Sequence, residues 1–290
     1  MAIELSSLTF TDRADVVPAS GVEQILNTGI ANTLAGNDII IGTSTISDFN
    51  TVGINNYSGV MNTGDGDDTL IGTSTGVFGY GIQNYNSGII NTGAGNDTII
   101  AIGPTYGIYN FNVIETGGGD DIITATGDDG IVNGGSIDTG DGRDIITGTA
   151  KGGDFGGIFN NIDGIINTGN GSDVITGIGV IGIYNDGIID TGNGEDSIIA
   201  YGGFSGIGSV LLGNGKDYLK GFGSGNFNGG NGKDALELTS GSYTVGISGT
   251  AVNFTKGSVI MYTSDFEKLI AGSTAYDFSS LTDGQTISVA

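Results

Sequence analysis

Apolar residues recur in this chain with a spacing that repeats along most of its length. Pairs of large apolar residues lie nine positions apart on either side of a Gly-rich segment, as in Met61 and Leu70 or Ile90 and Ile99. Around these pairs apolar and polar residues alternate with the period of two that is typical of a β-strand, and β-branched residues are frequent. No segment shows a sustained helical period. The pattern therefore predicts many short strands.

Each Gly-rich segment ends in an aspartate, and an Ile or Leu follows two residues later, as in residues 64–70. The aspartates of the nine copies are Asp38, Asp68, Asp97, Asp121, Asp144, Asp173, Asp196, Asp217 and Asp234. A repeat of about 20–30 residues is typical of stacked coils, so we expect the nine aspartates to form one column. Carboxylates about 5 Å apart repel by roughly 3 kcal/mol per pair at an effective dielectric near 20. We therefore predict that these nine residues are metal ligands.

The repeats predict an all-β fold, a right-handed parallel β-solenoid similar to a β-roll, with a small β-hairpin cap at its C-terminal end. We divide the chain into an N-terminal lead-in or cap (1–30), metal-binding solenoid repeats (31–240) and a C-terminal β cap (241–290). A second repeated element, Gly-Ile-x-Asn, predicts two half-coils in each repeat. Loops of variable length follow the strand after each aspartate, so one edge of the solenoid should be regular and the other irregular.

Composition limits the chemistry that this chain can perform. It has no Cys and no His, so only oxygen ligands remain, and these suit Ca²⁺ or Mg²⁺. The net charge of −24 opposes binding to nucleic acid, and no apolar stretch approaches the roughly 18 residues needed to span a membrane. The expected partners are calcium ions, with a glycan, a cell surface or a protein as further candidates. Aromatic residues near the variable loops are a candidate partner surface: Phe78, Tyr80, Tyr85, Tyr106, Tyr109, Phe111 and Phe155.

The turns resemble the calcium-binding nonapeptide of the repeats-in-toxin (RTX, hemolysin-type) family, Gly-Gly-x-Gly-x-Asp-x-U-x, where U is a large apolar residue. Residues 63–71 and 116–124 match it except for Thr at the first position. The resemblance implies a parallel β-roll, Ca²⁺ between stacked turns, and export in an unfolded state. In that family both edges bind ions. Here glycine stands where the second row of aspartates would fall, at Gly59, Gly88, Gly164 and Gly187. We therefore expect several Ca²⁺ ions along one edge only.

Two further columns accompany the aspartates. One contains Thr63, Thr92, Thr116, Thr139, Thr168 and Thr191, and the other contains Asn84, Asn110, Asn133, Asn160 and Asn185. We interpret both as side-chain ladders between stacked coils. The alternative is a flat Thr/Asn face that orders water or ice, or that grips a sugar. For the aspartates, the alternative to metal binding is that each closes its own bend by bonding its own backbone.

These features predict a secreted, calcium-binding solenoid with a structural or adhesive role and no catalytic activity. One alternative is a calcium-dependent enzyme acting on polysaccharides, with Arg143 or Lys151 as the basic residue. Another is a calcium-binding module that serves a larger catalytic assembly. The N-terminus does not resemble a signal peptide, so we expect export through a C-terminal signal in residues 277–290. The same residues can equally be the last strand of the cap.

Overall fold

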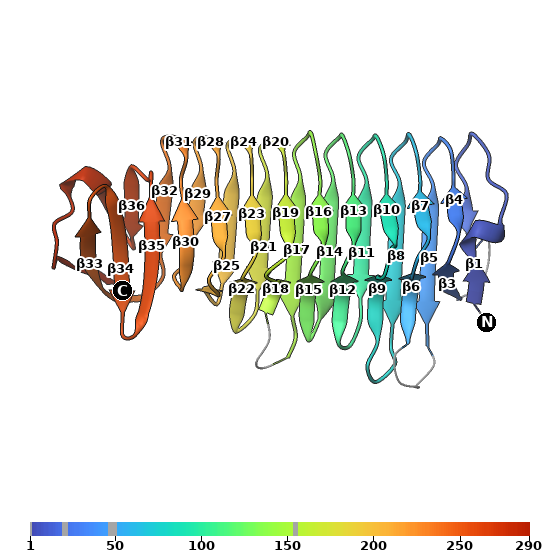
Figure 1. Ribbon diagram of the computed structural model, residues 1–290, viewed down its shortest axis with the longest axis horizontal. Helices are drawn as coiled ribbons and strands as arrows, with labels where there is room; N and C mark the ends of the chain where they lie inside the picture. Colours follow the sequence, from blue (N-terminus) through green and yellow to red (C-terminus); the bar gives the residue numbers. More distant parts are fainter. Residues whose placement is uncertain (1, 19–22, 46–50, 153–155) are drawn as a thin grey trace.

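The strands stack into a long series of parallel coils in the computed structural model (Figure 1), which describes residues 2–18, 23–45, 51–152 and 156–290. The predicted parallel β-solenoid is confirmed. Each coil, however, contains three strands and not the two half-coils that we expected. One strand follows the aspartate turn, the Gly-Ile-x-Asn strand comes next, and a third short strand leads to the next turn. Three parallel sheets therefore run along the solenoid and enclose its core.

Sheet A consists of the Gly-Ile-x-Asn strands and their N-terminal equivalents. Its strands are β1 (Ala2–Glu4), β3 (Gln24–Asn27), β6 (Val52–Asn56), β9 (Tyr80–Asn84), β12 (Tyr106–Asn110), β15 (Asp129–Asn133), β18 (Gly156–Asn160), β22 (Ile181–Asn185) and β26 (Phe204–Ser205).

Sheet B contains the strands that follow the aspartate turns. Its strands are β2 (Val16–Val17), β5 (Ile39–Ser44), β8 (Thr69–Ser74), β11 (Thr98–Ile102), β14 (Ile122–Gly127), β17 (Ile145–Ala150), β21 (Val174–Ile178), β25 (Ser197–Tyr201), β29 (Tyr218–Lys220), β32 (Ala235–Leu238), β36 (Lys268–Ala271) and β37 (Thr274–Asp277).

Sheet C contains the strands that precede the turns and continues into the cap. Its strands are β4 (Ile30–Asn32), β7 (Val60–Asn62), β10 (Ile89–Asn91), β13 (Val113–Glu115), β16 (Ser136–Asp138), β19 (Ile165–Asn167), β23 (Ile188–Asp190), β27 (Ser209–Leu211), β30 (Gly225–Asn228), β35 (Val259–Ser264), β34 (Ala251–Lys256), β33 (Gly241–Ser248) and β38 (Thr286–Val289). In the later turns a fourth, narrow sheet D forms from β20 (Asn170–Gly171), β24 (Asn193–Gly194), β28 (Asn214–Gly215) and β31 (Asn231–Gly232).

The core is built from columns of identical or similar apolar residues in register. In sheet B, Leu70 pairs with Ile99 and Ile99 with Ile123, and all three are 0% exposed. Sheets A and C supply equivalent columns, of which Ile82 and Ile90 are members. Burying an aliphatic side chain of this size stabilises the fold by about 1.5–3 kcal/mol. The nine-residue spacing seen in the sequence thus joins the core positions of sheets C and B across the turn.

The glycine of the Gly-Ile-x-Asn strand allows sheets A and B to approach closely. A Cβ atom on Gly81 would lie 2.4 Å from the backbone nitrogen of Ile102 in sheet B, a distance that no side chain can accept. Glycine is therefore required here for backbone-to-backbone contact, while the following Ile82 fills the core.

The C-terminal segment closes this end of the solenoid with antiparallel strands. Strand β33 pairs with β34 and β38, and β34 pairs with β35, which itself continues sheet C beside β30. A 3₁₀ turn, η2 (Phe278–Ser280), packs Phe278 against this cap, and a second 3₁₀ turn, η1 (Leu5–Ser7), lies near the N-terminus. The hairpin cap is confirmed. Residues 286–289 form its last strand, one of the two roles expected for this segment. The described residues include no helix of the length and apolarity needed to cross a membrane.

Most of the aromatic residues predicted near the variable loops gather over sheet A and the turn that follows it. The ring centroids of Tyr80 and Tyr106 are 5.3 Å apart, and those of Tyr109 and Phe111 are 4.6 Å apart. Tyr85 contacts both Tyr109 and Phe111. Phe155 lies outside the described residues.

Candidate functional site

The nine aspartates predicted as metal ligands form one buried column at the turn edge, which we call the aspartate column. Each side chain is 0–1% exposed. From Asp68 onward, the Oδ1 atom of each accepts a hydrogen bond from the backbone N–H of the aspartate one coil earlier, over 2.7–2.9 Å. The alternative, in which each aspartate bonds the backbone of its own bend, is wrong. The carboxylates instead connect successive coils.

Two acidic residues that the sequence analysis missed extend this column. At the N-terminal end, the backbone N–H of Asp15 donates to Asp38 over 2.7 Å. At the C-terminal end, the backbone N–H of Asp234 donates to Oε2 of Glu267 over 2.7 Å. Both residues stand two positions before a buried apolar residue, Val17 and Leu269, as the nine aspartates do. That spacing was the available signal, but neither residue follows a Gly-x-Gly turn.

The second carboxylate oxygen of every aspartate in the column is buried without a partner. None of the nine Oδ2 atoms has a hydrogen-bond donor in the described part of the chain. Most of the neighbouring threonine hydroxyls donate to a backbone carbonyl of the next coil, yet they lie close enough to the carboxyl groups to lower the pKa of Asp68 and Asp121. Thr63, for example, donates to the carbonyl of Thr92 over 2.9 Å. An unpaired buried carboxylate oxygen is costly, so a repeated set of nine requires an explanation.

Burial raises the pKa of the carboxyl groups in the column. It raises the pKa of Asp121 and Asp196 to about 7 and the pKa of Asp68, Asp144 and Asp217 to about 6. A threonine hydroxyl lowers the pKa of every one of these groups except Asp217, and the hydrogen bond from the preceding backbone N–H lowers it at all five. A neighbouring aspartate of the same column raises the pKa at all five. The column is therefore a place where negative charge is disfavoured unless a proton or a cation neutralises it.

The backbone of the turns brings carbonyl oxygens into the same stack. Gly95 has a φ of +135°, and a Cβ atom there would lie 2.1 Å from the carbonyl oxygen of Gly66 in the preceding turn. In the described residues this carbonyl accepts no backbone hydrogen bond. The positive φ and the close approach together require glycine. The donor set of the turns is thus carboxylate and carbonyl oxygen, the hard ligands that Ca²⁺ prefers.

The described residues contain no cluster of three or more acidic side chains that could hold a metal ion. Successive aspartates of the column are single contributions from each turn. Any ion between two turns would therefore receive at most two carboxylates of the column, and backbone carbonyls would have to supply the other protein ligands. The turns fit such an ion in ligand type, although they do not form a carboxylate cage.

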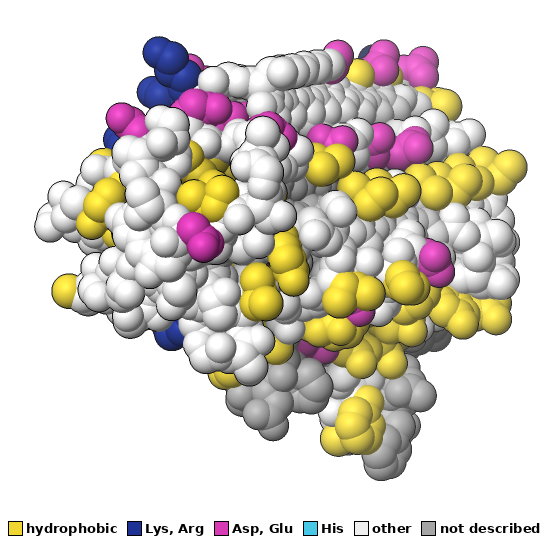
Figure 2. Space-filling model, turned by 60° about the vertical axis from the view of Figure 1, so that its left-hand side comes forward, with side chains coloured by type: hydrophobic (Ala, Val, Ile, Leu, Met, Phe, Trp, Pro, Cys, Tyr) yellow, Lys and Arg dark blue, Asp and Glu magenta, His cyan; other side chains and the backbone are white. Residues whose placement is uncertain are grey.

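Outside the aspartate column, the residue before each aspartate forms a second ladder in the early turns. The backbone N–H of Asn96 donates to Asp67, that of Asp120 to Asn96, and that of Arg143 to Asp120, over 2.7–2.9 Å. In the later turns an exposed asparagine ladder replaces it, with Asn193 donating to Asn170 over 2.6 Å. Acidic side chains consequently recur along the turn edge, at the top of Figure 2. Both ladders fix the register of the turns.

The threonine and asparagine columns are ladders, as predicted. Each threonine that the sequence analysis named is 0–1% exposed, so the threonine column does not form a flat outer face for ice, water or sugar, and that alternative is wrong. The asparagine column begins earlier than expected, with Asn27 and Asn56. Each asparagine from Asn27 to Asn160 donates its Nδ2 to Oδ1 of the next over 2.8–2.9 Å.

No protein-family model matches the chain, and none of the curated proteins matches it significantly.

Proposed function

We propose that this chain is a calcium-dependent β-solenoid of the RTX type, with a structural or adhesive role outside the cell and no catalytic activity of its own. The observation that carries the proposal is the set of nine buried Oδ2 atoms that lack a donor in the described residues. A row of like charges in a low-dielectric interior opposes folding. A divalent cation between successive turns would reverse the sign of that contribution.

The residues that would hold each ion are the aspartates of two successive turns, such as Asp68 and Asp97, with backbone carbonyls such as that of Gly66. Calcium would supply the positive charge that the column lacks. The chain itself links successive coils and positions the carbonyl oxygens. The Oδ1 atoms bind successive coils together through backbone N–H groups, and the turn glycines provide the positive φ angles that stack the carbonyls.

Calcium dependence would also couple folding to location. An ion that binds the folded but not the unfolded state stabilises the fold in proportion to the logarithm of its concentration. Calcium is scarce in the cytosol and abundant outside, so the column would oppose folding before export and favour it afterwards. The proposed location is supported by this logic and by the RTX-like turns, and a C-terminal export signal remains a prediction.

The test is to count the calcium bound by the full chain at pH 8 by equilibrium dialysis, and to record circular dichroism with and without chelator. Nine stacked turns have eight gaps, so we expect several ions and at most eight between aspartates of the column. Asp97→Ala should remove calcium from two adjacent gaps, while Asp128→Ala, at an exposed site, should not. Absence of bound calcium would refute the proposal, and unchanged stoichiometry in Asp97→Ala would refute the shared ligand.

A further inference from the structure

The outer face of sheet C changes character where the solenoid joins its cap. Along the coils, one outward column of this sheet is mainly apolar and contains Ile30, Val60, Ile89, Val113, Ser136, Ile165 and Ile188. The next outward column contains Asn32, Asn62, Asn91, Glu115, Asp138, Asn167 and Asp190. From β27 onward the same two columns continue with Ser209, Asn226 and Tyr262, and with Leu211, Asn228 and Ser264. The apolar stripe and the acidic side chains both end here.

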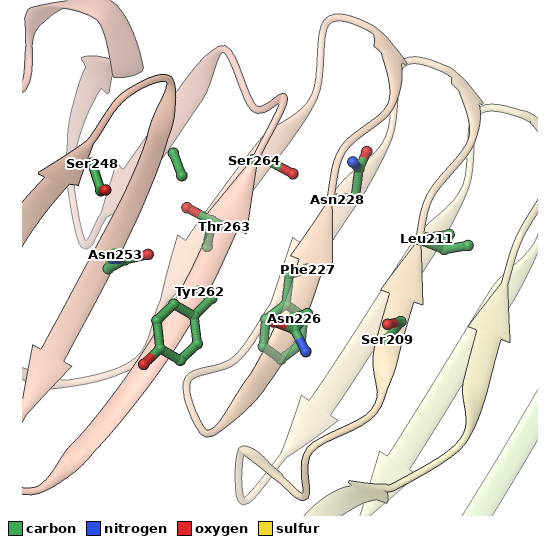
Figure 3. A pocket seen from close by; sticks show the side chains of 11 residues that line it. Ser209, Leu211, Asn226, Phe227, Asn228, Ser248, Asn253, Tyr262, Thr263 and Ser264 are labelled. Carbon is green, nitrogen blue, oxygen red and sulfur yellow. The ribbon is translucent and has the colours of Figure 1, made fainter. Parts of the chain in front are cut away.

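A hollow of about 510 Å³ lies over this part of the sheet (Figure 3). Its floor is formed by strands β27, β30, β35 and β34, and the turn end of β33 contributes Ser248. Strand pairing places Ser209, Asn226, Tyr262 and Asn253 in one row across the four strands. Because most of these side chains are small or of medium size, the row lines a shallow depression in the sheet.

The lining carries no charged side chain, although the molecule has a net charge of −24. The polar groups that line the hollow are hydroxyls and carboxamides, from Ser209, Asn226, Asn228, Ser248, Asn253, Tyr262 and Ser264. Such groups recognise a ligand by hydrogen bonds and do not provide a counter-ion. The chemistry of the hollow therefore selects a neutral, hydrogen-bonding ligand.

The carboxamides are arranged so that oxygen atoms remain to accept hydrogen bonds. Nδ2 of Asn228 donates to Asp265 over 2.9 Å, and Nδ2 of Asn226 donates to the carbonyl of Ile207 over 3.2 Å. Oδ1 of Asn253 is buried and has no donor in the described residues. A ligand cannot reach this buried atom, but the Oδ1 atoms of Asn226 and Asn228 are not buried and accept no hydrogen bond from the described residues. A ligand that supplies hydroxyl protons would satisfy these two acceptors.

The hollow is also lined by an aromatic ring, that of Tyr262. Tyr262 is 48% exposed and stands on β35, between Asn226 on β30 and Asn253 on β34. The apolar face of an exposed ring can pack against C–H groups of a ligand, while the neighbouring hydroxyl and carboxamide groups hydrogen-bond to its O–H groups. This combination matches a sugar ring, which presents both.

We propose that this hollow is a binding site for a neutral saccharide. The ligand packs a sugar ring against Tyr262 and donates hydroxyl hydrogen bonds to the carboxamide oxygens of Asn226 and Asn228. The proposal does not depend on calcium in the turns, because no residue of the aspartate column lines the hollow. It gives the solenoid a specific partner at one end.

The full chain, in millimolar calcium, is tested against a printed panel of neutral oligosaccharides of glucose, galactose, mannose and N-acetylglucosamine. Any oligosaccharide that is retained is then titrated by calorimetry. We expect at least one to bind, and Tyr262→Ala and Asn226→Leu each to weaken that binding by at least about tenfold. Tyr262→Phe, which keeps the ring, should retain most of the affinity.

The matched control is Tyr201→Ala, because Tyr201 is 51% exposed on sheet B, a different face of the solenoid. Its affinity should equal that of the unmodified chain, and circular dichroism should show all variants folded. The proposal is overturned if no oligosaccharide of the panel binds. It is equally overturned if Tyr262→Ala and Asn226→Leu bind as tightly as the unmodified chain, or if Tyr201→Ala weakens binding as much as they do.

Discussion

Two buried columns of polar side chains run along this solenoid, and they satisfy their hydrogen bonds to very different extents. In the asparagine column each Nδ2 donates to Oδ1 of the next asparagine, so the side chains satisfy one another. Only Oδ1 of Asn27, at the start of the column, lacks a donor in the described residues. In the aspartate column each Oδ1 is satisfied by a backbone N–H, but an Oδ2 remains unpaired in every turn. The two columns share burial, stacking and register.

The difference teaches that a carboxylate cannot replace a carboxamide in such a ladder without a third participant. An asparagine carries both donor and acceptor, whereas an ionised aspartate carries only acceptors. The asparagine column is therefore complete within the chain, and it should be indifferent to ions and pH. The aspartate column requires a cation or protons, and its contribution to stability should depend on both.

The largest effect is expected when a charge is placed in the complete column. Asn110 donates to Asn133 and accepts from Asn84, each over 2.8 Å. Asn110→Asp removes the donor and buries an unpaired carboxylate, so it should destabilise the fold by about 3–5 kcal/mol with or without calcium. Urea unfolding measures this. Asn91→Asp, on the outer face of sheet C, is the control and should cost less than about 0.5 kcal/mol.

In chelator, the free energy of unfolding should increase by about 2–4 kcal/mol as the pH falls from 8 to 5. The increase is smaller than the sum over single groups, because protonation of one aspartate reduces the repulsion that favours protonation of its neighbours. Burial raises the folded-state pKa of Asp121 and Asp196 to about 7 and that of Asp68 to about 6. These groups are therefore protonated in the folded state before they are protonated in the unfolded chain. Their stabilising protonation is present at low pH and is lost as the pH rises through 6–7. Urea unfolding at several pH values in chelator tests this, and a flat or opposite dependence would contradict it.

Asp97→Asn should change stability in opposite directions with and without calcium. In chelator at pH 8 the carboxamide removes one charge from the column and brings donors beside unpaired oxygens, so we expect a gain of about 1–2 kcal/mol. In millimolar calcium the same change removes a charged ligand from two gaps and should lower the melting temperature. A loss of stability under both conditions would indicate that Asp97 is purely structural.

The smallest effect is expected at the C-terminal end of the column. Glu267 is exposed and accepts the backbone N–H of Asp234 over 2.7 Å. Glu267→Ala should cost about 0.5–1 kcal/mol, because water can replace part of the lost bond. Glu267→Gln keeps an acceptor and should be nearly neutral in chemical denaturation. If Glu267→Ala and Glu267→Gln lost the same free energy of unfolding, the hydrogen bond to Asp234 would not explain how Glu267 stabilises the fold.

Most of the fold could be predicted from the sequence, because coils that stack in register place their core residues at a constant spacing in each repeat. The nine-position spacing from Ile90 to Ile99 spans the turn between two core columns, and the structure confirms that register. The third strand of each coil could not be separated from its neighbours, because strands such as β10 contain only three residues. The asparagine column was anticipated from Asn84 onward, but Asn27 and Asn56 were missed.

The site was predicted less completely. The nine aspartates are brought into one column, as their common position in the repeat indicated. Their burial and the bonds from Oδ1 to the backbone of the preceding coil could not be foreseen, because turn residues are usually exposed and close their own bends. The roles of Asp15 and Glu267 depend on strands that pair with the solenoid without a Gly-x-Gly turn, so no motif marks them.

The most direct test of the central claim is the melting temperature of the full chain at pH 8, in chelator and in millimolar calcium at equal ionic strength. Neutralisation of the aspartate column by calcium predicts a melting temperature higher by ten degrees or more in calcium, on the order expected when several kcal/mol are gained. Equal melting temperatures under the two conditions would contradict the account.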